Sequence, residues 1–141
     1  MRREETKQEA CTLSTKKDDT SQTALLGAQA AIEKKAENVK VLYLGECSSF
    51  TDYFVICSGI STRQVQAIAD SIQNTLRPRQ KVISSEGYQD GRWVLLDYGD
   101  VVFHIFLDAV RDYYNLELLW SDAPRVKLPS EFYGPAAVRL N

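Results

Sequence analysis

The sequence predicts an α/β fold in which a mixed β-sheet is flanked by helices. Two stretches carry this prediction. Residues 65–76 repeat apolar side chains at helical spacing, whereas residues 93–97 and 101–107 are rich in β-branched and aromatic residues on either side of Tyr98-Gly99. Further segments give the order helix, two strands, helix, three strands, helix, which is typical of helices layered on a sheet.

The composition is that of an ordinary soluble domain with a small excess of acid. Of the 141 residues, 44% are hydrophobic and 26% are charged, and the formal net charge is −2. Nucleic-acid binding relies on Lys and Arg residues that neutralise phosphates, so this balance predicts little or no direct nucleic-acid contact. An acidic protein that binds a basic protein agrees better with the charge.

The cysteines and the hydropathy favour a cytoplasmic protein. Cys11, Cys47 and Cys57 show no metal-binding or redox spacing, which indicates reduced thiols. No apolar run approaches the roughly 20 residues of a membrane span, and no secretory signal follows Arg2 and Arg3. We therefore expect no membrane partner, and we expect Cys57 to be a small core residue rather than a catalytic thiol.

The first half of the chain predicts a tail, a helix and two strands. Residues 1–20 are polar and charged, which predicts a disordered or added tail. Ser21 is the expected N-cap of a helix over residues 21–37. Residues 38–44 alternate as a strand, and the apolar run over residues 53–58 predicts a strand buried on both faces in the middle of the sheet.

The second half begins with a clear helix signal. Ser61 and Gln64 have the spacing of a capping box, and the helix behind them carries an apolar face made of Val65, Ile68, Ala69, Ile72 and Leu76. Residues 81–85 predict a short strand, followed by the hairpin. Asp108 is the expected cap of a last helix over residues 109–120, and residues 123–141 predict an extended C-terminal tail.

The hairpin places two kinds of surface back to back. With Tyr98-Gly99 as the turn, Asp97 faces Asp100 and Trp93 faces His104. One face is apolar and predicts core: Val94, Leu96, Val101, Phe103, Ile105 and Leu107. The other face is mixed: Trp93, Leu95, Asp97, Asp100, Val102, His104 and Phe106. Two facing carboxylates cost about 0.2–1 kcal/mol, which suggests a surface that awaits a basic partner.

Three groups on or near this hairpin leave alternatives open. Asp97 and Asp100 are either ordinary turn residues or an acidic pair for a partner's Lys or Arg, with a Mg²⁺ site as the third choice. His104, the only histidine, is favoured as part of an interaction surface over a general base or metal ligand. The turn with Ser58, Gly59, Ser61 and Arg63 is a helix cap by preference and an anion site as the alternative.

Three strings resemble a known family. TDYFVICSGISTRQVQAIAD, EGYQDGRWVLLDYGDVVFHIF and RDYYNLELLW occur in this order and resemble the ribosome silencing factor family, also called Iojap-like proteins. The resemblance covers residues 21–122. It implies a fold similar to the nucleotidyltransferase fold without its catalytic motif. It also implies a non-enzymatic protein that uses no cofactor.

The resemblance implies a partner and a mechanism as well. Members of the family bind the large ribosomal subunit through its basic ribosomal protein number fourteen. They thereby block subunit joining and repress translation under nutrient limitation. They also form homodimers, and relatives act in organelles.

The residues expected to meet the partner match the family's motifs. They are Trp93, Leu95, Asp97, Asp100, Val102 and His104 on the hairpin and Tyr114, Glu117 and Trp120 on the last helix. Two alternatives remain: a Mg²⁺-dependent enzyme similar to nucleotidyltransferases, which uses Asp97 and Asp100, and a homodimeric scaffold with no ribosomal role. The first lacks the Gly-Ser and paired-carboxylate motif of such enzymes, since Ser58-Gly59 has the reverse order.

Overall fold

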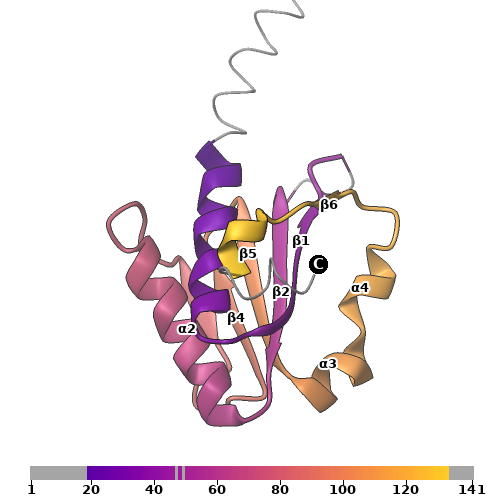
Figure 1. Cartoon of the computed structure of the whole chain (residues 1–141). Helices are drawn as coiled ribbons and strands as arrows, with labels where there is room; N and C mark the ends of the chain where they lie inside the picture. Colours follow the sequence, from indigo (N-terminus) through magenta and orange to yellow (C-terminus); the bar gives the residue numbers. More distant parts are fainter. Residues whose placement is uncertain (1–18, 47, 49, 134–141) are drawn as a thin grey trace, which may run out of the picture.

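A six-stranded mixed sheet forms the centre of the computed structural model, which describes residues 19–46, 48 and 50–133 (Figure 1). The strand order is β3-β4-β5-β2-β1-β6. The strands are β1 (Glu37–Tyr43), β2 (Tyr53–Gly59), β3 (Ser84–Glu86), β4 (Trp93–Asp97), β5 (Val101–Leu107) and β6 (Arg125–Val126). Only β2 and β5 pair in parallel, and the other neighbours are antiparallel. The predicted α/β class is confirmed.

Helices cover the two faces of this sheet unequally. The first helix (residues 19–33 of those described) and α2 (Thr62–Leu76) lie on one face. Their buried side chains form the main core with one side of β1, β2, β4 and β5. The shorter α3 (Asp108–Tyr114) and α4 (Leu116–Leu119) lie on the other face, over a smaller apolar cluster. The second face is therefore only partly covered.

The two strongest local patterns give the predicted elements. Ser61 Oγ accepts from the Gln64 N–H at 3.1 Å, and Gln64 Oε1 accepts from the Ile60 N–H at 2.8 Å, so the capping signal is confirmed. The five predicted apolar residues of α2 are its buried residues. The run at residues 53–58 becomes β2, which lies between β5 and β1 and is largely buried, as expected.

The expected hairpin register is wrong, because the two-residue turn lies one position further along the chain. Asp97 pairs with Val102 and Trp93 pairs with Phe106, because the turn is Gly99-Asp100 and the Tyr98 N–H donates to the Val101 carbonyl at 2.9 Å. Gly99 supplies the positive φ of +86°. Every cross-strand partner moves by two positions, which preserves the alternation of faces. The two predicted faces are therefore correct, but Asp97 and Asp100 do not oppose each other.

Element ends differ from prediction at three main places. Ser21 is not an N-cap, because residues 19 and 20 are already helical, and the helix ends at residue 33 rather than 37. The short strand begins at Ser84 instead of residue 81. The tail predicted for residues 1–20 falls almost wholly outside the described residues.

The last helix is broken where a single helix was expected. Leu107 is the N-cap of α3, and Asp108 lies in its first turn without a capping hydrogen bond. Asn115 then adopts a left-handed conformation (φ +44°) and separates α3 from α4. Asn tolerates this region better than most residues, which places the break at this position.

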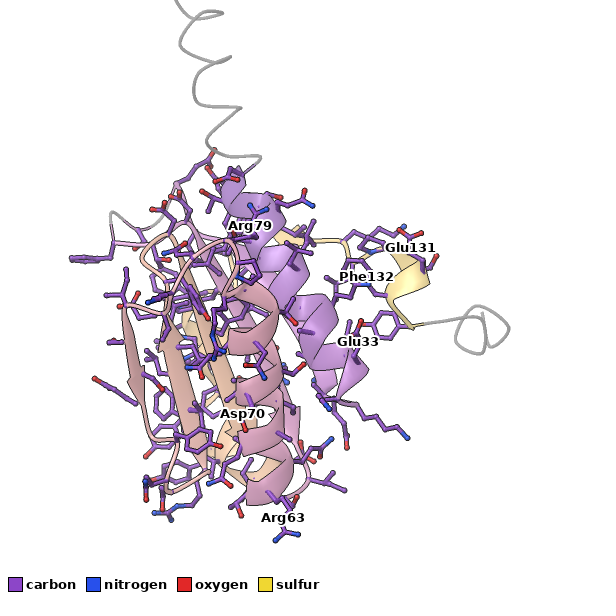
Figure 2. All side chains as sticks on the ribbon, turned by 90° about the vertical axis from the view of Figure 1, so that its left-hand side faces the viewer. Glu33, Arg63, Asp70, Arg79, Glu131 and Phe132 are labelled. Atoms are coloured by element: carbon purple, nitrogen blue, oxygen red, sulfur yellow. The ribbon has the colours of Figure 1, made fainter. Side chains whose placement is uncertain are left out.

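The C-terminal segment is more ordered than an extended arm as far as the structure describes it. It adds β6 beside β1 and ends in the 3₁₀ helix η1 (Ser130–Tyr133). Figure 2 shows Glu131 and Phe132 of η1 next to the first helix, which carries Glu33. The segment thus runs from one sheet edge to the helical layer.

Candidate docking surface

The part of the second sheet face that α3 and α4 leave open contains most of the predicted hairpin residues. Trp93, Leu95, Asp97 and Val102 are all half-buried there. Glu86 on β3 pairs with Leu95 across the strands, so its side chain belongs to the same face, and it is exposed. We call the five residues Glu86, Trp93, Leu95, Asp97 and Val102 the open face. Glu86 was missed from the sequence because its strand is only three residues long.

His104 lies beneath this face in an aromatic cluster. The indole Nε1–H of Trp93 donates to His104 Nδ1 at 3.2 Å, and the Phe54 ring meets the imidazole edge-on at 4.6 Å. Burial lowers the pKa of His104 to about 4. Because Nδ1 accepts a hydrogen bond, Nε2 carries the proton of the neutral ring, and it has no partner among the described residues. His104 is thus a buried support of Trp93 rather than a surface group.

Two residues of the last helical region complete the cluster. The Tyr114 ring lies 4.9 Å from the Trp93 ring, and the Trp120 ring meets Phe54 edge-on at 5.8 Å. Phe106 stacks on Trp93 at 4.8 Å. The structure therefore brings together four of the residues that were expected to meet the partner, Trp93, His104, Tyr114 and Trp120, with Phe54 as an additional member. Aromatic pairs at such separations stabilise each other beyond their burial.

A partly buried ion-pair network, centred on the buried Arg111, fixes α3 and α4 to the sheet, and the sequence did not predict it. Arg111 Nε donates to Glu117 Oε1 at 2.9 Å, and Lys40 Nζ lies 2.9 Å from Glu117 Oε2. Arg111 Nη1 also donates to Ser58 Oγ at 3.2 Å. Burial alone would raise the pKa of Glu117, but the hydrogen bonds and charges of Arg111 and Lys40 together lower it. Glu117 and Ser58, both predicted site residues, therefore serve the internal structure here.

The two aspartates of the hairpin have separate roles. Asp97 Oδ1 accepts from the Gly99 N–H at 2.8 Å, which is a typical turn contact. Asp100 is exposed, and its backbone carbonyl accepts from the N–H groups of Asp52 and Tyr53. The expected facing pair is thus replaced by two independent carboxylates. Within residues 19–46, 48 and 50–133, no group of three or more His, Cys, Asp or Glu residues could hold a metal ion.

The predicted turn residues mostly organise the start of α2. Ser61 caps the helix, and Gly59 is buried where a Cβ would press on Gln64 and Val65 at 3.2–3.3 Å. Ser58 is buried at the end of β2, whereas Arg63 is exposed at the end of the molecule shown in Figure 2. The cap interpretation accounts for Ser61, and an anion at this turn remains a sequence-based prediction.

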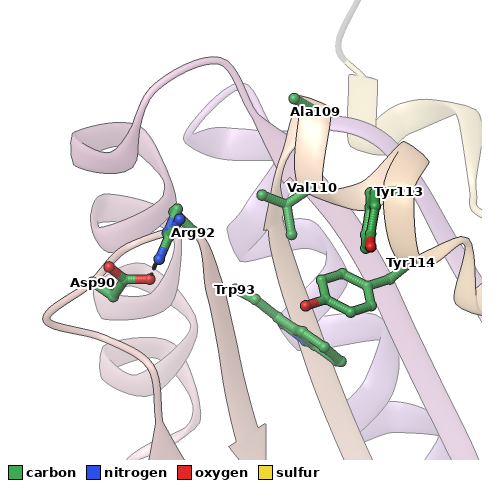
Figure 3. Close-up of a pocket in the computed structure, with 7 residues that line it drawn as sticks. All are labelled: Asp90, Arg92, Trp93, Ala109, Val110, Tyr113 and Tyr114. Atoms are coloured by element: carbon green, nitrogen blue, oxygen red, sulfur yellow. Dashed lines mark hydrogen bonds and ion pairs between the residues drawn. The ribbon is translucent and has the colours of Figure 1, made fainter.

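A groove opens beside the open face, between α3 and the loop at residues 87–92 (Figure 3). Its volume is about 390 Å³. Trp93, Val110 and Tyr114 supply apolar walls, and Asp90 and Arg92 form an exposed ion pair at 2.8 Å on the loop side. Tyr113, on the same helix, is 82% exposed. Such an arrangement suits a protein side chain with an apolar body.

Comparison with known proteins decides the family. The model of the family described as "Ribosomal silencing factor during starvation" matches residues 17–139. The chain belongs to this family. Ribosomal silencing factor RsfS of Halalkalibacterium halodurans is 47% identical over 104 residues, which are 73% of this chain and 89% of that protein. The chloroplastic protein Iojap of Arabidopsis thaliana is 33% identical over 104 residues, which are 74% of this chain and 44% of that protein.

A solved structure agrees with the fold. The crystal structure of a protein from Chromobacterium violaceum superposes with a TM-score of 0.70 at 33% identity, and it covers 82% of this chain and 97% of that one. The resemblance expected from the sequence is confirmed by these matches. Among the described helices, none combines the length and the apolar character that crossing a bilayer requires.

Proposed function

We propose that this protein represses translation by binding the large ribosomal subunit and blocking its joining with the small subunit. The contact is made with the basic large-subunit ribosomal protein number fourteen, through the open face. The site of action is wherever ribosomes of this kind work, in the cytoplasm or in an organelle. We assign the functional domain to residues 21–122, flanked by the N-terminal segment 1–20 and the C-terminal segment 123–141.

One observation carries the proposal: an apolar surface that is bordered by the carboxylates of acidic residues. Leu95, Val102 and Trp93 are incompletely covered by the chain itself. Glu86, Asp97 and Asp100 lie around them, and none of these carboxylates forms an ion pair with a residue that the structure describes. An apolar centre with an acidic rim suits a basic protein, and the rim steers its approach. Family membership supports the ribosome as its source.

The transferase hypothesis has lost one of the observations that motivated it. It was motivated by Asp97 and Asp100 as facing carboxylates, and Asp97 pairs with Val102 instead. A homodimer stays a prediction. Light scattering would measure the mass of the free protein, and only ribosome binding separates a silencing factor from a simple scaffold.

Co-sedimentation with purified large subunits tests the proposal. We expect the wild type to travel with the subunits, and Trp93→Ala to bind about thirtyfold more weakly, equivalent to about 2 kcal/mol at a buried aromatic anchor. Trp93 also supports the aromatic cluster, so Leu95→Ala is the cleaner second variant. Ile60→Ala is the matched control, because Ile60 is 70% exposed just before the Ser61 N-cap of α2, outside the open face. A wild type that stays in the supernatant ends the proposal.

The charge argument has its own test. Asp97→Asn with Asp100→Asn should weaken binding and flatten its dependence on salt, since two attractive charges are lost. Glu33→Gln with Glu131→Gln changes the net charge equally on the helical side of the molecule (Figure 2) and should have little effect. Stronger binding by the first double variant would show that the rim does not meet cations.

A further inference from the structure

Trp93 separates two hollows on the same side of the sheet. One is the groove beside α3, with a volume of about 390 Å³. The other has a volume of about 260 Å³ and is lined by Glu86, Gly87, Trp93 and Leu95. Trp93 lines both hollows, so a chain that crosses this residue meets one hollow before it and the other after it.

The loop at residues 87–92, which forms the outer wall of the groove, is fixed by hydrogen bonds to α2. Gln66 Nε2 on α2 donates to the Tyr88 carbonyl at 2.8 Å, and the Tyr88 hydroxyl donates to Asp70 at 3.0 Å. Within the loop, the Gly91 N–H donates to the Gly87 carbonyl at 3.0 Å. The groove is therefore formed before a partner arrives, and a preorganised site loses less entropy on binding.

The smaller hollow differs from the groove in charge. Its floor is the apolar surface of Leu95 and Trp93, and Glu86 provides an exposed carboxylate without an ion-pair partner among the described residues. In the groove, the acidic Asp90 is already paired with Arg92. The groove therefore suits an uncharged apolar side chain, and the smaller hollow suits an apolar side chain next to a cation.

We propose that the partner docks through one segment that crosses Trp93 and fills both hollows. It places an aromatic or large aliphatic side chain in the groove between Trp93, Val110 and Tyr114. It places a second apolar side chain over Leu95, with a neighbouring Lys or Arg paired to Glu86. This two-anchor contact rests on the proposed function, and it names the chemistry of the segment that the basic partner protein must present.

The occupant is a protein segment on two grounds. The walls are mainly apolar and aromatic, and the charged lining residue outside the Asp90–Arg92 ion pair is Glu86, which disfavours RNA phosphates. Trp93 also belongs to the open face and to both hollows, so one partner contacts the open face and the two hollows together. Anchors that fill preformed pockets near the centre of an interface contribute most of its affinity.

Two variants test the two hollows separately. Ala109→Trp fills the groove from the exposed start of α3, and Glu86→Lys reverses the charge of the smaller hollow. Each should weaken binding to purified large subunits at least tenfold, and the double variant should bind more weakly than either single variant. Asn74→Trp, on the exposed side of α2, is the control for an added indole and should bind as the wild type does.

The outcomes separate this inference from the proposed function. If the wild type binds and both Ala109→Trp and Glu86→Lys bind equally well, the hollows are unoccupied and the inference is overturned. If only one variant loses affinity, the two-anchor contact is wrong as well. If the wild type itself fails to bind, the proposed function falls first. Thermal unfolding of each variant shows whether a loss comes from misfolding, and Tyr113→Ala, at an 82% exposed residue, removes part of the groove wall without adding bulk.

Discussion

Replacing Arg111 with methionine should be the most damaging single change outside the main core. Its side chain is only 7% exposed, and it contacts Glu117, Ser58 and the Glu37 carbonyl at 2.9, 3.2 and 3.4 Å. Breaking a buried ion pair by removing one partner costs about 3–5 kcal/mol. Glu117 keeps Lys40 at 2.9 Å and is 17% exposed, so its charge is not left alone. We therefore expect a loss of about 2–3 kcal/mol.

Urea and thermal unfolding measure this loss. For a chain of this size, 1 kcal/mol corresponds to about 4 °C in Tm, so Arg111→Met should lower Tm by about 8–12 °C. Arg92→Met is the matched control, because the Arg92–Asp90 pair is as short, at 2.8 Å, but lies in solvent. It should leave Tm almost unchanged, since exposed ion pairs contribute little.

A double-mutant cycle locates the effect. If the energy lies in the Arg111–Glu117 pair, Arg111→Met should cost much less in a Glu117→Leu background, with a coupling of about 1–3 kcal/mol. An Arg111→Met loss below about 0.5 kcal/mol, or a cycle without coupling, would refute the reasoning that this network fixes α3 and α4 to the sheet.

Three further changes have defined outcomes. Burial holds the His104 pKa at about 4, whereas in the unfolded chain it is about 6.5. As pH falls, the unfolded state therefore binds the proton first. The free energy of unfolding should fall by roughly 3 kcal/mol between about pH 6.5 and about pH 4. His104→Phe should lose this part of the pH dependence in urea unfolding. The folded structure lowers the pKa of Glu117, so the stability that its carboxylate contributes is present above its unfolded-state pKa and is lost as pH falls through its folded-state pKa. Glu117→Gln should therefore show a smaller decline in Tm than the wild type below about pH 4.5. Asn115→Ala should lower Tm because φ is +44° there, whereas Asn115→Gly should be nearly neutral.

Local patterns were sufficient for the elements with strong periodicity. The helix at residues 62–76 and the buried strand at residues 53–59 follow from side chains close in sequence, which is the information that periodicity contains. The hairpin faces were also predictable, because a shift of two positions keeps each side chain on its face. The turn itself was not, since both Tyr98-Gly99 and Gly99-Asp100 offer a glycine for positive φ.

The support of the candidate site depended on contacts that no local pattern contains. Arg111 lies among apolar and aromatic residues of α3, where a charged residue usually indicates the solvent side. It is buried because Ser58 and the Glu37 carbonyl, which are distant in sequence, and Glu117, which follows the break at Asn115, all contact it. The break at Asn115 was missed for a related reason: residues 109–120 alone fit one helix, and the packing of α4 against the sheet requires the chain to turn.

The side chain of Gln64 links the ends of two helices. It accepts from the Ile60 N–H and donates to the carbonyls of Lys34 and Lys35, at 2.8, 3.1 and 3.0 Å. The end of the first helix and the start of α2 are thereby joined by one amide group, although they lie about thirty residues apart in sequence. In native-state hydrogen exchange, the amides at these two ends should open as one cooperative unit. They should share one protection factor, and it should be lower than the protection of the remaining amides in each helix.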